Sequence, residues 1–301
     1  MTTNTRAALL IYNPNAGRGG GHRAREVARF CEHLKAHRIE VTVASTAGPG
    51  DAARLAAQAA GENIYSEVIV SGGDGTINEA LQGLVGSGAR LAIWPRGTAN
   101  VLARELRLPF DAKSAAQVFA RGATRPISVG CAVEDGSGAR RYFFLMAGVG
   151  LDASVVRRVP ARLKRRVGEA AFWYSGLGHL AHWQPEAFTV EIDGQDFPAT
   201  FAAIGKAPRY GGNLAITPRA RLDGVEFEVC VVDSRSRFRY LYLLSHAMRG
   251  GVADGMGAVR FFRATRVHAT GDALVQADGE LIGQLPMTFE IIPRAIEIVV
   301  P

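Results

Sequence analysis

The stretch that decides the fold is Val68-Ile69-Val70-Ser71-Gly72-Gly73-Asp74-Gly75-Thr76-Ile77-Asn78-Glu79. It begins with a short apolar run, which is typical of a buried parallel strand. Three glycines then surround Asp74, and a helical pattern starts at once. Glycine lets the backbone approach a ligand closely, and the N-terminus of the following helix offers free N–H groups to phosphate. An aspartate in such a loop needs a cation or a sugar hydroxyl beside it, so the stretch indicates nucleotide phosphates with a divalent metal ion nearby.

Strand and helix patterns alternate on both sides of this stretch. Strand patterns at residues 8–12, 41–44, 67–71 and 91–94 are each followed by a helical pattern. This alternation is typical of βαβ units in a parallel sheet, whose strand-to-helix loops share one edge. We therefore predict an α/β nucleotide-binding domain over residues 1–126.

From Pro126 onward the pattern changes to short strands separated by turn sequences such as Asp193-Gly194, a hairpin signal. Helical patterns interrupt it at residues 160–182 and 240–250, and a strand pattern covers 225–232. We predict that residues 127–301 form a second, β-rich domain with an antiparallel sandwich. Return of the last strand, at about residues 287–301, to the first domain is left open.

Composition limits the class of partner without choosing one. The 301 residues suffice for two domains. Lys and Arg number 35 against 28 Asp and Glu, a net charge of +7, which favours acidic partners such as nucleotides or anionic lipid. No recognised nucleic-acid-binding module accompanies this charge, so nucleic acid is not an expected partner.

The cysteines and the apolar runs indicate the compartment. Cys31, Cys131 and Cys230 are scattered and form no CxxC pair, which argues against a disulfide framework or a zinc site and favours a reducing cytosol. We find no signal-peptide pattern, and the run at residues 143–151 is too short to cross a bilayer. We expect a cytoplasmic protein that meets a membrane only from its surface, and we leave a homodimer open.

Three strand-to-helix loops could converge on phosphate. They lie at residues 12–21, 72–76 and 95–100. Each alone could be a structural tight turn, but three in one domain favour a nucleotide site. Asn13 and Asn100 could bind only the backbone of their turns, and Thr76 with Glu79 fits a capping box, Thr-x-x-Glu.

These loops resemble the diacylglycerol kinase catalytic-domain family, which includes bacterial lipid kinases and the sphingosine kinases. The matching motifs, in chain order, are Asn13-Pro14-x-x-Gly17, Gly72-Gly73-Asp74-Gly75-Thr76 with Asn78-Glu79, Pro95-x-Gly97-Thr98-x-Asn100, Ala147-Gly148-Val149-Gly150-Leu151-Asp152-Ala153, Tyr210-Gly211-Gly212, Pro218-x-Ala220-x-x-Asp223-Gly224 and Asp278-Gly279-Glu280. The resemblance implies an ATP-dependent kinase with a lipid acceptor such as diacylglycerol, a nucleotide-binding N-terminal domain and a β-rich domain that contributes to a lipid cleft. It also implies peripheral association with the inner membrane surface.

The resemblance also implies roles for single residues. Asp278 matches the general base, Glu280 its supporting carboxylate, and Asp74 the aspartate that organises ATP-bound Mg²⁺. A structural Mg²⁺ is implied at Asp223, with the carbonyl groups of Ala220 and Val225 as further ligands. The nucleotide-binding residues implied by the three loops are Asn13, Gly17, Arg18, Gly72, Gly73, Asp74, Gly75, Thr76, Glu79, Gly97, Thr98 and Asn100. Many relatives carry aspartate after the matching asparagine, where this chain has Val101.

Several alternatives stay open at this point. Asp278-Gly279 and Asp223-Gly224 are also ordinary turn sequences, like Asp193-Gly194. The Gly-Gly-Asp-Gly-Thr loop is shared with NAD kinases, and a non-catalytic module that binds lipid or nucleotide is a further interpretation. The basic run at residues 157–166, followed by Phe172-Trp173-Tyr174, suits either docking on anionic lipid or a solvated helix face.

Overall fold

The computed structural model describes residues 6–17, 22–61, 65, 67–158, 185–211, 214–256 and 258–301. The chain divides into two compact units. Unit 1 contains Met1–Ile127 and Arg294–Pro301, and unit 2 contains Ser128–Pro293. The basic run and the aromatic triplet beyond residue 158, and the helical pattern predicted at 160–182, lie outside the described residues.

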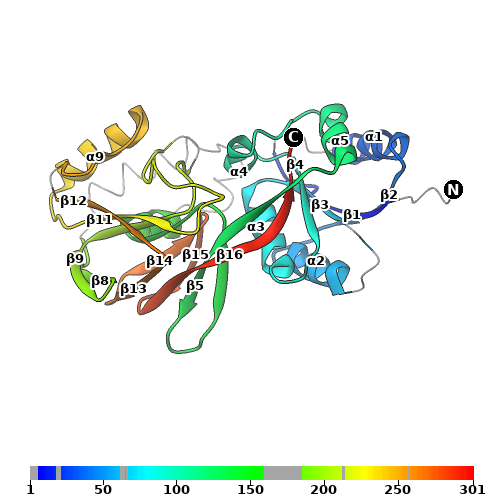
Figure 1. Ribbon diagram of the computed structural model, residues 1–301. Helices are drawn as coiled ribbons and strands as arrows, with labels where there is room; N and C mark the ends of the chain where they lie inside the picture. The colour runs from blue at the N-terminus through cyan, green and yellow to red at the C-terminus, as the bar shows by residue number, and fades with distance from the viewer. Residues whose placement is uncertain are drawn as a thin grey trace. The chain divides into compact units, whose positions relative to one another are not determined.

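Unit 1 is a parallel sheet covered by helices (Figure 1). Its strands are β1 (Arg6–Tyr12), β2 (Ile39–Ser45), β3 (Glu67–Gly72), β4 (Arg90–Pro95) and the end of β16 (Met287–Val299), in the order β2-β1-β3-β4-β16 with every pairing parallel. Its helices are α1 (Arg23–Ala36), α2 (Asp51–Gly61), α3 (Asp74–Leu84), α4 (Val101–Glu105) and α5 (Ala112–Arg121). The predicted parallel α/β architecture is confirmed.

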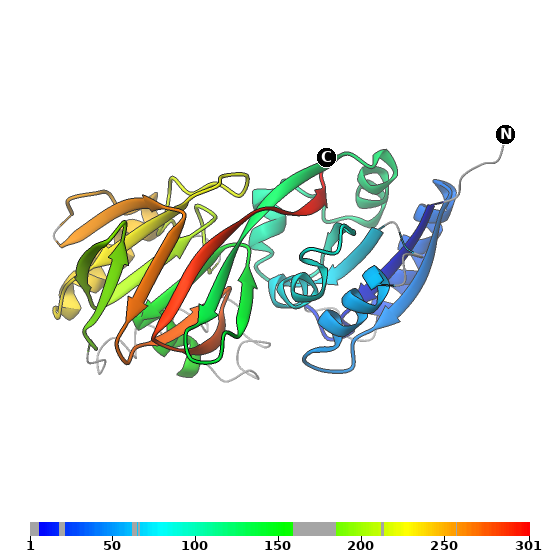
Figure 2. The ribbon, with the colours of Figure 1, turned by 60° about the horizontal axis from the view of Figure 1, so that its bottom comes forward.

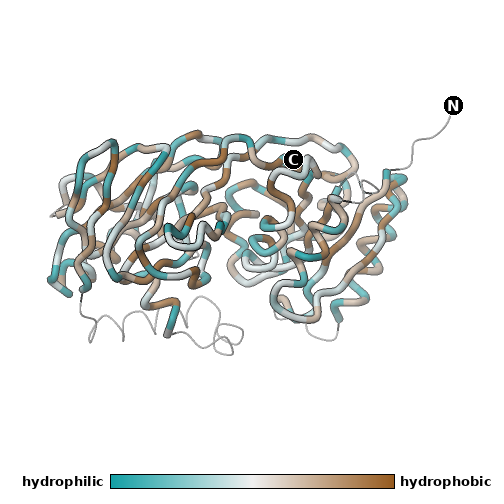
Figure 3. The backbone as a smooth tube through the Cα atoms, turned by 90° about the horizontal axis from the view of Figure 1, so that it is seen from below, coloured by the Kyte–Doolittle hydropathy of each residue, from teal (hydrophilic) through white to brown (hydrophobic). Residues whose placement is uncertain are grey.

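The sequence pattern explains how this sheet is buried. All six residues of β3 are buried, as expected for a strand with helices on both faces. On one face Phe30 of α1 stacks on Trp94 of β4 with ring centroids 4.2 Å apart, and Phe119 of α5 meets Phe30 edge-on at 5.8 Å. Figure 3 shows hydrophobic stretches running along the strands of both units. The packed strands therefore hold the loops at their carboxyl ends in place.

Unit 2 is an antiparallel sandwich (Figure 2). One sheet has the order β12-β11-β10-β7-β14-β15 and is built from β7 (Met146–Gly150), β10 (Phe201–Gly205), β11 (Phe227–Val232), β12 (Val259–Ala264), β14 (Leu274–Ala277) and β15 (Glu280–Gln284). The facing sheet contains β5 (Thr124–Glu134), β6 (Arg140–Phe143), β8 (Phe188–Ile192), β9 (Gln195–Ala199), β13 (Arg266–Thr270) and the first part of β16. The predicted β-sandwich is confirmed.

Helix α9 (Arg237–Arg249) covers the face of the six-stranded sheet that points away from the sandwich core. Along β10, Ala202 and Ile204 belong to the sandwich core, whereas Phe201 and Ala203 pack with α9. The helix predicted at 240–250 is thus present and begins three residues earlier. The strand predicted from residue 225 begins at Phe227 instead, and Val225 is 55% exposed. No helix among the described residues has both the length and the apolar character needed to cross a bilayer.

Candidate functional site

The three predicted loops of unit 1 are joined to one another, and we call residues 13–17, 72–76 and 96–100 the rim. The N–H of Asn13 donates to the carbonyl oxygen of Ser71 at 3.0 Å, and the N–H of Arg96 donates to the carbonyl oxygen of Gly72 at 2.8 Å. These bonds continue the parallel strand pairing past the strand ends. The sheet therefore delivers all three loops to one edge, as the alternation of strands and helices predicted.

Three glycines let the loops of the rim touch backbone to backbone. A Cβ on Gly97 would overlap the Cα of Gly73, and a Cβ on Gly73 would lie 3.1 Å from the Cα of Gly97. Gly17 has φ +68° and sits against the carbonyl oxygen of Arg96, 2.5 Å from where its Cβ would be. No side chain fits at these positions, so glycine here serves close approach rather than flexibility.

Asp74 links the second loop of the rim to the third. Its carboxylate accepts the N–H groups of Val101 at 3.1 Å and of Leu102 at 3.2 Å, the first residues of α4. Burial raises the pKa of Asp74, and these two backbone hydrogen bonds partly oppose that rise. Asp74 therefore caps α4 with an anionic oxygen, the charge that a helix N-terminus favours.

The valine at position 101 leaves this contact intact. Its backbone N–H, not its side chain, reaches Asp74, and its side chain is buried with 4% exposure. Any residue except proline can donate such a bond. The departure from the common motif thus removes a carboxylate from this helix start without disconnecting the two loops.

The two asparagines of the rim hold backbone. Asn100 has φ 49°, accepts the N–H of Gly97 at 2.7 Å and donates to the Gly97 carbonyl at 2.8 Å. Asn13 accepts the N–H of Asn15 at 2.9 Å and donates from Nδ2 to the Thr76 hydroxyl at 3.1 Å. Asn100 thus fixes its own turn, and Asn13 connects the first loop to the second.

The predicted capping box is wrong. Helix α3 begins at Asp74 with Gly73 as its N-cap residue, so Thr76 lies inside the first turn and is not the cap. The Glu79 carboxylate accepts the N–H of Gly50 instead, just before α2. It therefore ties α3 to the start of α2. The exposed positions of the rim include Gly75 and Thr98, and Arg18 lies outside the described residues.

Arg23, the first residue of α1, was missed by sequence reasoning. It is 4% exposed, and its Nη2 donates to the carbonyl oxygens of Ala16 at 3.0 Å and Arg96 at 3.1 Å. Glu26 accepts from Arg23 at 3.1 Å and from Arg96 at 2.5 Å. Burial is the main cause that lowers the pKa of Arg23, and the neighbouring Arg96 adds to it. A buried arginine on an amphipathic helix has no sequence signal that separates it from a solvated one.

This charged cluster forms one wall of a pocket at the rim. The lining residues are Ala16, Gly17, Arg23, Pro95, Arg96, Gly97, Thr98, Asn100 and Phe110. The guanidinium of Arg96 lies over the Trp94 ring at 5.4 Å. Two arginines and the glycines of two loops line this pocket, which suits an anionic ligand such as a phosphate chain.

Asp278 lies in unit 2, in the tight turn between β14 and β15. It has φ 47° and Gly279 has φ 83°, so the two form a hairpin turn. The Asp278 carboxylate accepts the N–H groups of Phe144 at 2.8 Å, Leu145 at 2.9 Å and Met146 at 3.0 Å, where the chain enters β7. These three hydrogen bonds fix the position of the carboxylate relative to the start of β7. The turn and the functional interpretation are therefore compatible.

Glu280 points elsewhere. Its carboxylate is bound by Arg141 of β6, and its side chain is 43% exposed. The resemblance implied a carboxylate that supports Asp278. The interaction found for Glu280 is instead an ion pair with the neighbouring strand.

A buried polar network connects the Asp278 turn with Asp152, the second residue of α6 (Leu151–Arg158). The amide of Gln276, itself fully buried, donates to Asp152 at 2.5 Å and accepts from the Tyr210 hydroxyl at 3.1 Å and the Gly279 N–H at 2.7 Å. Burial raises the pKa of Asp152 to about 7, although the Gln276 bond opposes the rise. Burial is also the main cause that raises the pKa of Tyr210.

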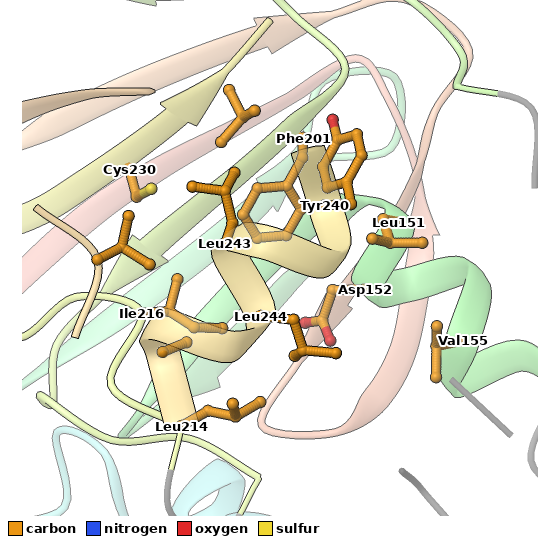
Figure 4. Close-up of a pocket in the computed structure, with 13 residues that line it drawn as sticks. Leu151, Asp152, Val155, Phe201, Leu214, Ile216, Cys230, Tyr240, Leu243 and Leu244 are labelled. Carbon is orange, nitrogen blue, oxygen red and sulfur yellow. The ribbon is translucent and has the colours of Figure 1, made fainter. Parts of the chain in front are cut away.

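Asp152 also lines an apolar pocket under α9 (Figure 4). The described lining residues are Leu151, Asp152, Val155, Phe201, Leu214, Ile216, Cys230, Val232, Tyr240, Leu243, Leu244, Ala247 and Val252. Asp152 is the only charged side chain among them. Sequence reasoning quoted Asp152 only as part of a motif, and its place in an otherwise apolar segment was the available signal.

The turn at residues 220–225 binds the side-chain ammonium group of Lys206. The ammonium of Lys206, a fully buried side chain, donates to the carbonyl oxygens of Arg221 at 3.0 Å and Gly224 at 2.6 Å. Burial lowers the pKa of Lys206 to about 8, and Asp223 acts in the opposite direction, so the charged form predominates at pH 7. Arg221 binds both Asp223 oxygens, at 3.0 and 3.1 Å.

The structural magnesium ion implied at Asp223, Ala220 and Val225 stays a prediction for this turn. Lys206 binds the carbonyl groups of Arg221 and Gly224 rather than those of the implied ligands, and a magnesium ion would have to displace Arg221 from the Asp223 carboxylate. The described residues also contain no group of three or more His, Cys, Asp or Glu side chains able to hold a metal ion.

Comparison with known proteins agrees with this geometry. Residues 7–132 match the family "Diacylglycerol kinase catalytic domain", and residues 146–300 match the "YegS C-terminal NAD kinase beta sandwich-like domain". The chain is 30% identical over 296 residues to a diacylglycerol kinase of Mycobacterium tuberculosis (strain CDC 1551 / Oshkosh), covering 97% of this chain and 94% of that protein. This chain belongs to the diacylglycerol kinase family.

Other relatives agree along the whole chain. A diacylglycerol kinase of Bacillus subtilis (strain 168) is 29% identical over 301 residues, which is 98% of this chain and 96% of that protein. A crystal structure of a diacylglycerol kinase from Bacillus anthracis (strain Sterne) superposes with a TM-score of 0.75 at 21% identity, covering 99% of this chain and 98% of that chain. At that identity the superposition supports the fold alone. The resemblance seen in the motifs is confirmed: the protein is a lipid kinase of this family, and the family implies the use of ATP.

The Arg23 cluster leads to a first prediction. In Arg23→Met the carbonyl groups of Ala16 and Arg96 lose a charged donor, so we expect the free energy of unfolding to fall by about 2 kcal/mol and the KM for nucleotide to rise. Urea denaturation and initial-rate kinetics measure the two effects. The matched control is Arg25→Met, an exposed arginine on the same helix. Equal effects in both variants would contradict the role of Arg23.

Lys206 leads to a second prediction. Lys206→Met leaves two carbonyl groups without their ammonium partner, and we expect a loss of about 1–3 kcal/mol in the free energy of unfolding. Lys113→Met, at an exposed lysine, should change stability little. Binding of the implied structural Mg²⁺ should raise the thermal midpoint of the unsubstituted protein in the absence of nucleotide. An unchanged midpoint at millimolar Mg²⁺ would show that the turn does not bind the ion.

Proposed function

We propose that this kinase transfers the γ-phosphoryl group of ATP to the hydroxyl of a diacylglycerol-type lipid. The rim of unit 1 holds the nucleotide, and the apolar pocket of unit 2 holds part of the acceptor. The name of the curated relatives supports this acceptor, and the pocket supports it from the chemistry of the chain. A second enzyme reading, an NAD kinase, has no comparable support because the pocket is apolar.

The apolar pocket is the observation that carries the proposal. Its cavity volume is about 130 Å³, close to the roughly 150 Å³ of a cavity that binds benzene. It therefore accepts several methylene groups of one acyl chain rather than a whole lipid. Asp152 gives this apolar space a carboxyl group at one end, which is the arrangement expected for an amphipathic ligand with a polar group beside its chains.

The residues around the Asp278 turn then have separate tasks. Asp278, whose carboxylate is held by three N–H donors, is the proposed base that accepts the proton of the lipid hydroxyl as it attacks. Asp152 orients that hydroxyl, and Gln276 holds Asp152 at a fixed place relative to the turn. Glu280 is engaged by Arg141, so in this proposal it positions β15 and moves no proton.

In this proposal the rim binds ATP, the phosphoryl donor. Backbone N–H groups at the start of α3 and the guanidinium of Arg96 would stabilise the phosphate charge as transfer proceeds, and Arg23 holds the carbonyl groups of the two neighbouring loops in place. The carboxylate of Asp74 is the type of oxygen ligand that Mg²⁺ prefers, and a magnesium ion held there would neutralise charge on the nucleotide phosphates. Gly17, Gly72, Gly73, Gly75 and Gly97 leave room for the phosphates to approach, and Thr98 is exposed beside them.

A labelled-ATP assay tests this function. The purified protein is incubated with extracted membrane lipids, with dispersed diacylglycerol or with NAD, and products are identified by mass spectrometry. The proposal expects a phosphorylated lipid and no NADP. It also expects Asp278→Asn to lose transfer while still binding nucleotide. Consumption of no ATP with any lipid would favour a binding module instead.

Asp74 gives a third prediction, with a control built into the chain. Asp111 caps α5 by accepting the Ser114 N–H at 2.8 Å, much as Asp74 caps α4. Because asparagine caps a helix about as well as aspartate, Asp74→Asn and Asp111→Asn should both cost less than the roughly 1 kcal/mol typical of losing a cap. Only Asp74→Asn should abolish phosphoryl transfer. Similar activity losses in the two variants, measured on folded protein, would reduce Asp74 to a helix cap.

Asp152 gives a fourth prediction, through pH. Its pKa is about 7 in the folded protein against an ordinary 3.8, so the folded state holds its proton more tightly than the unfolded chain. The stability from this group is full below pH 4 and is lost as pH rises through 7. Asp152→Asn should therefore melt at a higher temperature than the unsubstituted protein at pH 8 and nearly equally at pH 4. Its turnover should fall and its KM for lipid should rise.

Thermal scans at pH 4 and 8 measure the first effect, and initial rates measure the second. A variant that melts lower than the unsubstituted protein at pH 8 would show that the Asp152 carboxylate contributes to stability rather than to function.

A further inference from the structure

We propose that the outward face of α9 docks on an anionic lipid bilayer, so that the apolar pocket beneath it receives its ligand from the membrane. This surface consists of Phe238, Leu241, Tyr242 and Met248 with Arg235, Arg237, Arg239 and Arg249. The inference rests on the proposed lipid acceptor for its purpose, but the docking itself is tested without catalysis.

Helix α9 has two apolar faces. Tyr240, Leu243 and Ala247 are buried at 5%, 7% and 3% exposure against the sheet. The opposite face carries Phe238 at 83%, Leu241 at 40%, Tyr242 at 53% and Met248 at 55% exposure. Among the described residues eight large hydrophobic side chains are exposed, and four of them lie on this one helix. Such a concentration marks an interaction site rather than scattered surface residues.

The arginines next to this apolar face favour a negatively charged partner. Between Asp233 and Asp254 the sequence contains four arginines and no acidic residue. A helix advances 100° per residue, so Arg237 and Arg239 lie on either side of Phe238. Arginines that flank an apolar stripe can place their charges in the headgroup layer while the stripe enters the acyl boundary. The complement of this surface is therefore anionic and apolar together, as in a bilayer with acidic lipid.

A second copy of this chain is a poorer partner for the same face. A two-fold interface would place the face against itself, and the arginines of both copies would then meet with no acidic residue from either α9. Like charges brought together in this way oppose association. The charge pattern thus favours the membrane over a homodimer through α9.

The docking surface and the apolar pocket lie on opposite sides of the same helix, α9. Tyr240, Leu243 and Leu244 of α9 line the pocket from the inner side of the helix (Figure 4), and Ala247 of the same helix also lines it. A helix with its side chains is about 10 Å across, so a bilayer on the outer face would lie one helix away from the pocket. The lipid then needs to pass only the edge of α9.

The experiment measures vesicle binding without nucleotide. The protein is sedimented with anionic vesicles of phosphatidylcholine that contain roughly 30% phosphatidylglycerol. The comparison is sedimentation with neutral vesicles of phosphatidylcholine alone. Each basic residue near an anionic surface contributes roughly fivefold in affinity. We expect Arg237→Gln/Arg239→Gln to bind about tenfold or more weakly, Phe238→Ser/Met248→Ser to bind several-fold more weakly, and added salt to weaken binding of the unsubstituted protein.

Matched controls come from unit 1. Arg25→Gln/Arg29→Gln removes two exposed arginines of α1, and Val43→Ser removes a side chain that is 44% exposed on β2. Both should bind vesicles as the unsubstituted protein does. Turnover on a short-chain, monomerically dispersed acceptor should be unchanged in the α9 variants, whereas turnover on a vesicle-borne acceptor should fall. That pair of assays separates a failure of docking from a failure of the lipid kinase proposal.

Three results would overturn the proposal. One is unchanged vesicle binding in both α9 variants. Another is equal binding of the unsubstituted protein to neutral and anionic vesicles, or binding to neither. The third is a shift from dimer to monomer in the α9 variants without vesicles, measured by light scattering, which would assign the face to a second copy of the chain.

Discussion

The contact between the Asp74 carboxylate and the first N–H groups of α4 is the constraint on which the rest of unit 1 depends. It binds the glycine loop after β3 to the loop after β4, at the point where Gly73 and Gly97 touch. A carboxylate held this way is partly desolvated, and the two backbone donors offset that penalty. Asp74 is also the first residue of α3. The N-terminus of this helix favours phosphate, and the Asp74 carboxylate favours the counter-ion of that phosphate. Structural capping and ligand binding therefore draw on one residue.

The arrangement of the loops could be predicted from sequence, but the contacts that fix them could not. Parallel strands end at a shared edge, so three strand-to-helix loops were expected together. Helix α3 begins at Asp74 with Gly73 as its N-cap residue, before the Thr-x-x-Glu pattern, which is why the capping box failed. Arg23 and Glu79 bind backbone carbonyl and N–H groups of distant segments. The residues next to Arg23 and Glu79 in the sequence do not indicate which distant backbone groups these side chains will bind.

In unit 2 the motif resemblance identified Asp278, yet the reason for its environment lies in strand register. Gln276 of β14 stands opposite Gly148 of β7, and a Cβ on Gly148 would come within 2.8 Å of the Gln276 amide nitrogen. That missing side chain gives Asp152 and Gln276 room to meet. Register between strands more than a hundred residues apart is decided by packing of the whole sandwich. The sequence therefore indicated a candidate aspartate in a turn, and the structure adds the second carboxylate connected to it.

Helix α9 shows why a correctly predicted element can still conceal its role. Its sequence predicts a helix, but apolar residues lie on both of its faces, and its only charged residues apart from His246 are arginines. A helix of this kind is normally buried on all sides or lies at a membrane. Here the sheet covers one face only, and the described residues leave Phe238 with 83% of its surface open. Burial of the outer face would remove apolar area from water at about 25 cal/mol per Å², and the flanking arginines decide that the covering medium must be anionic.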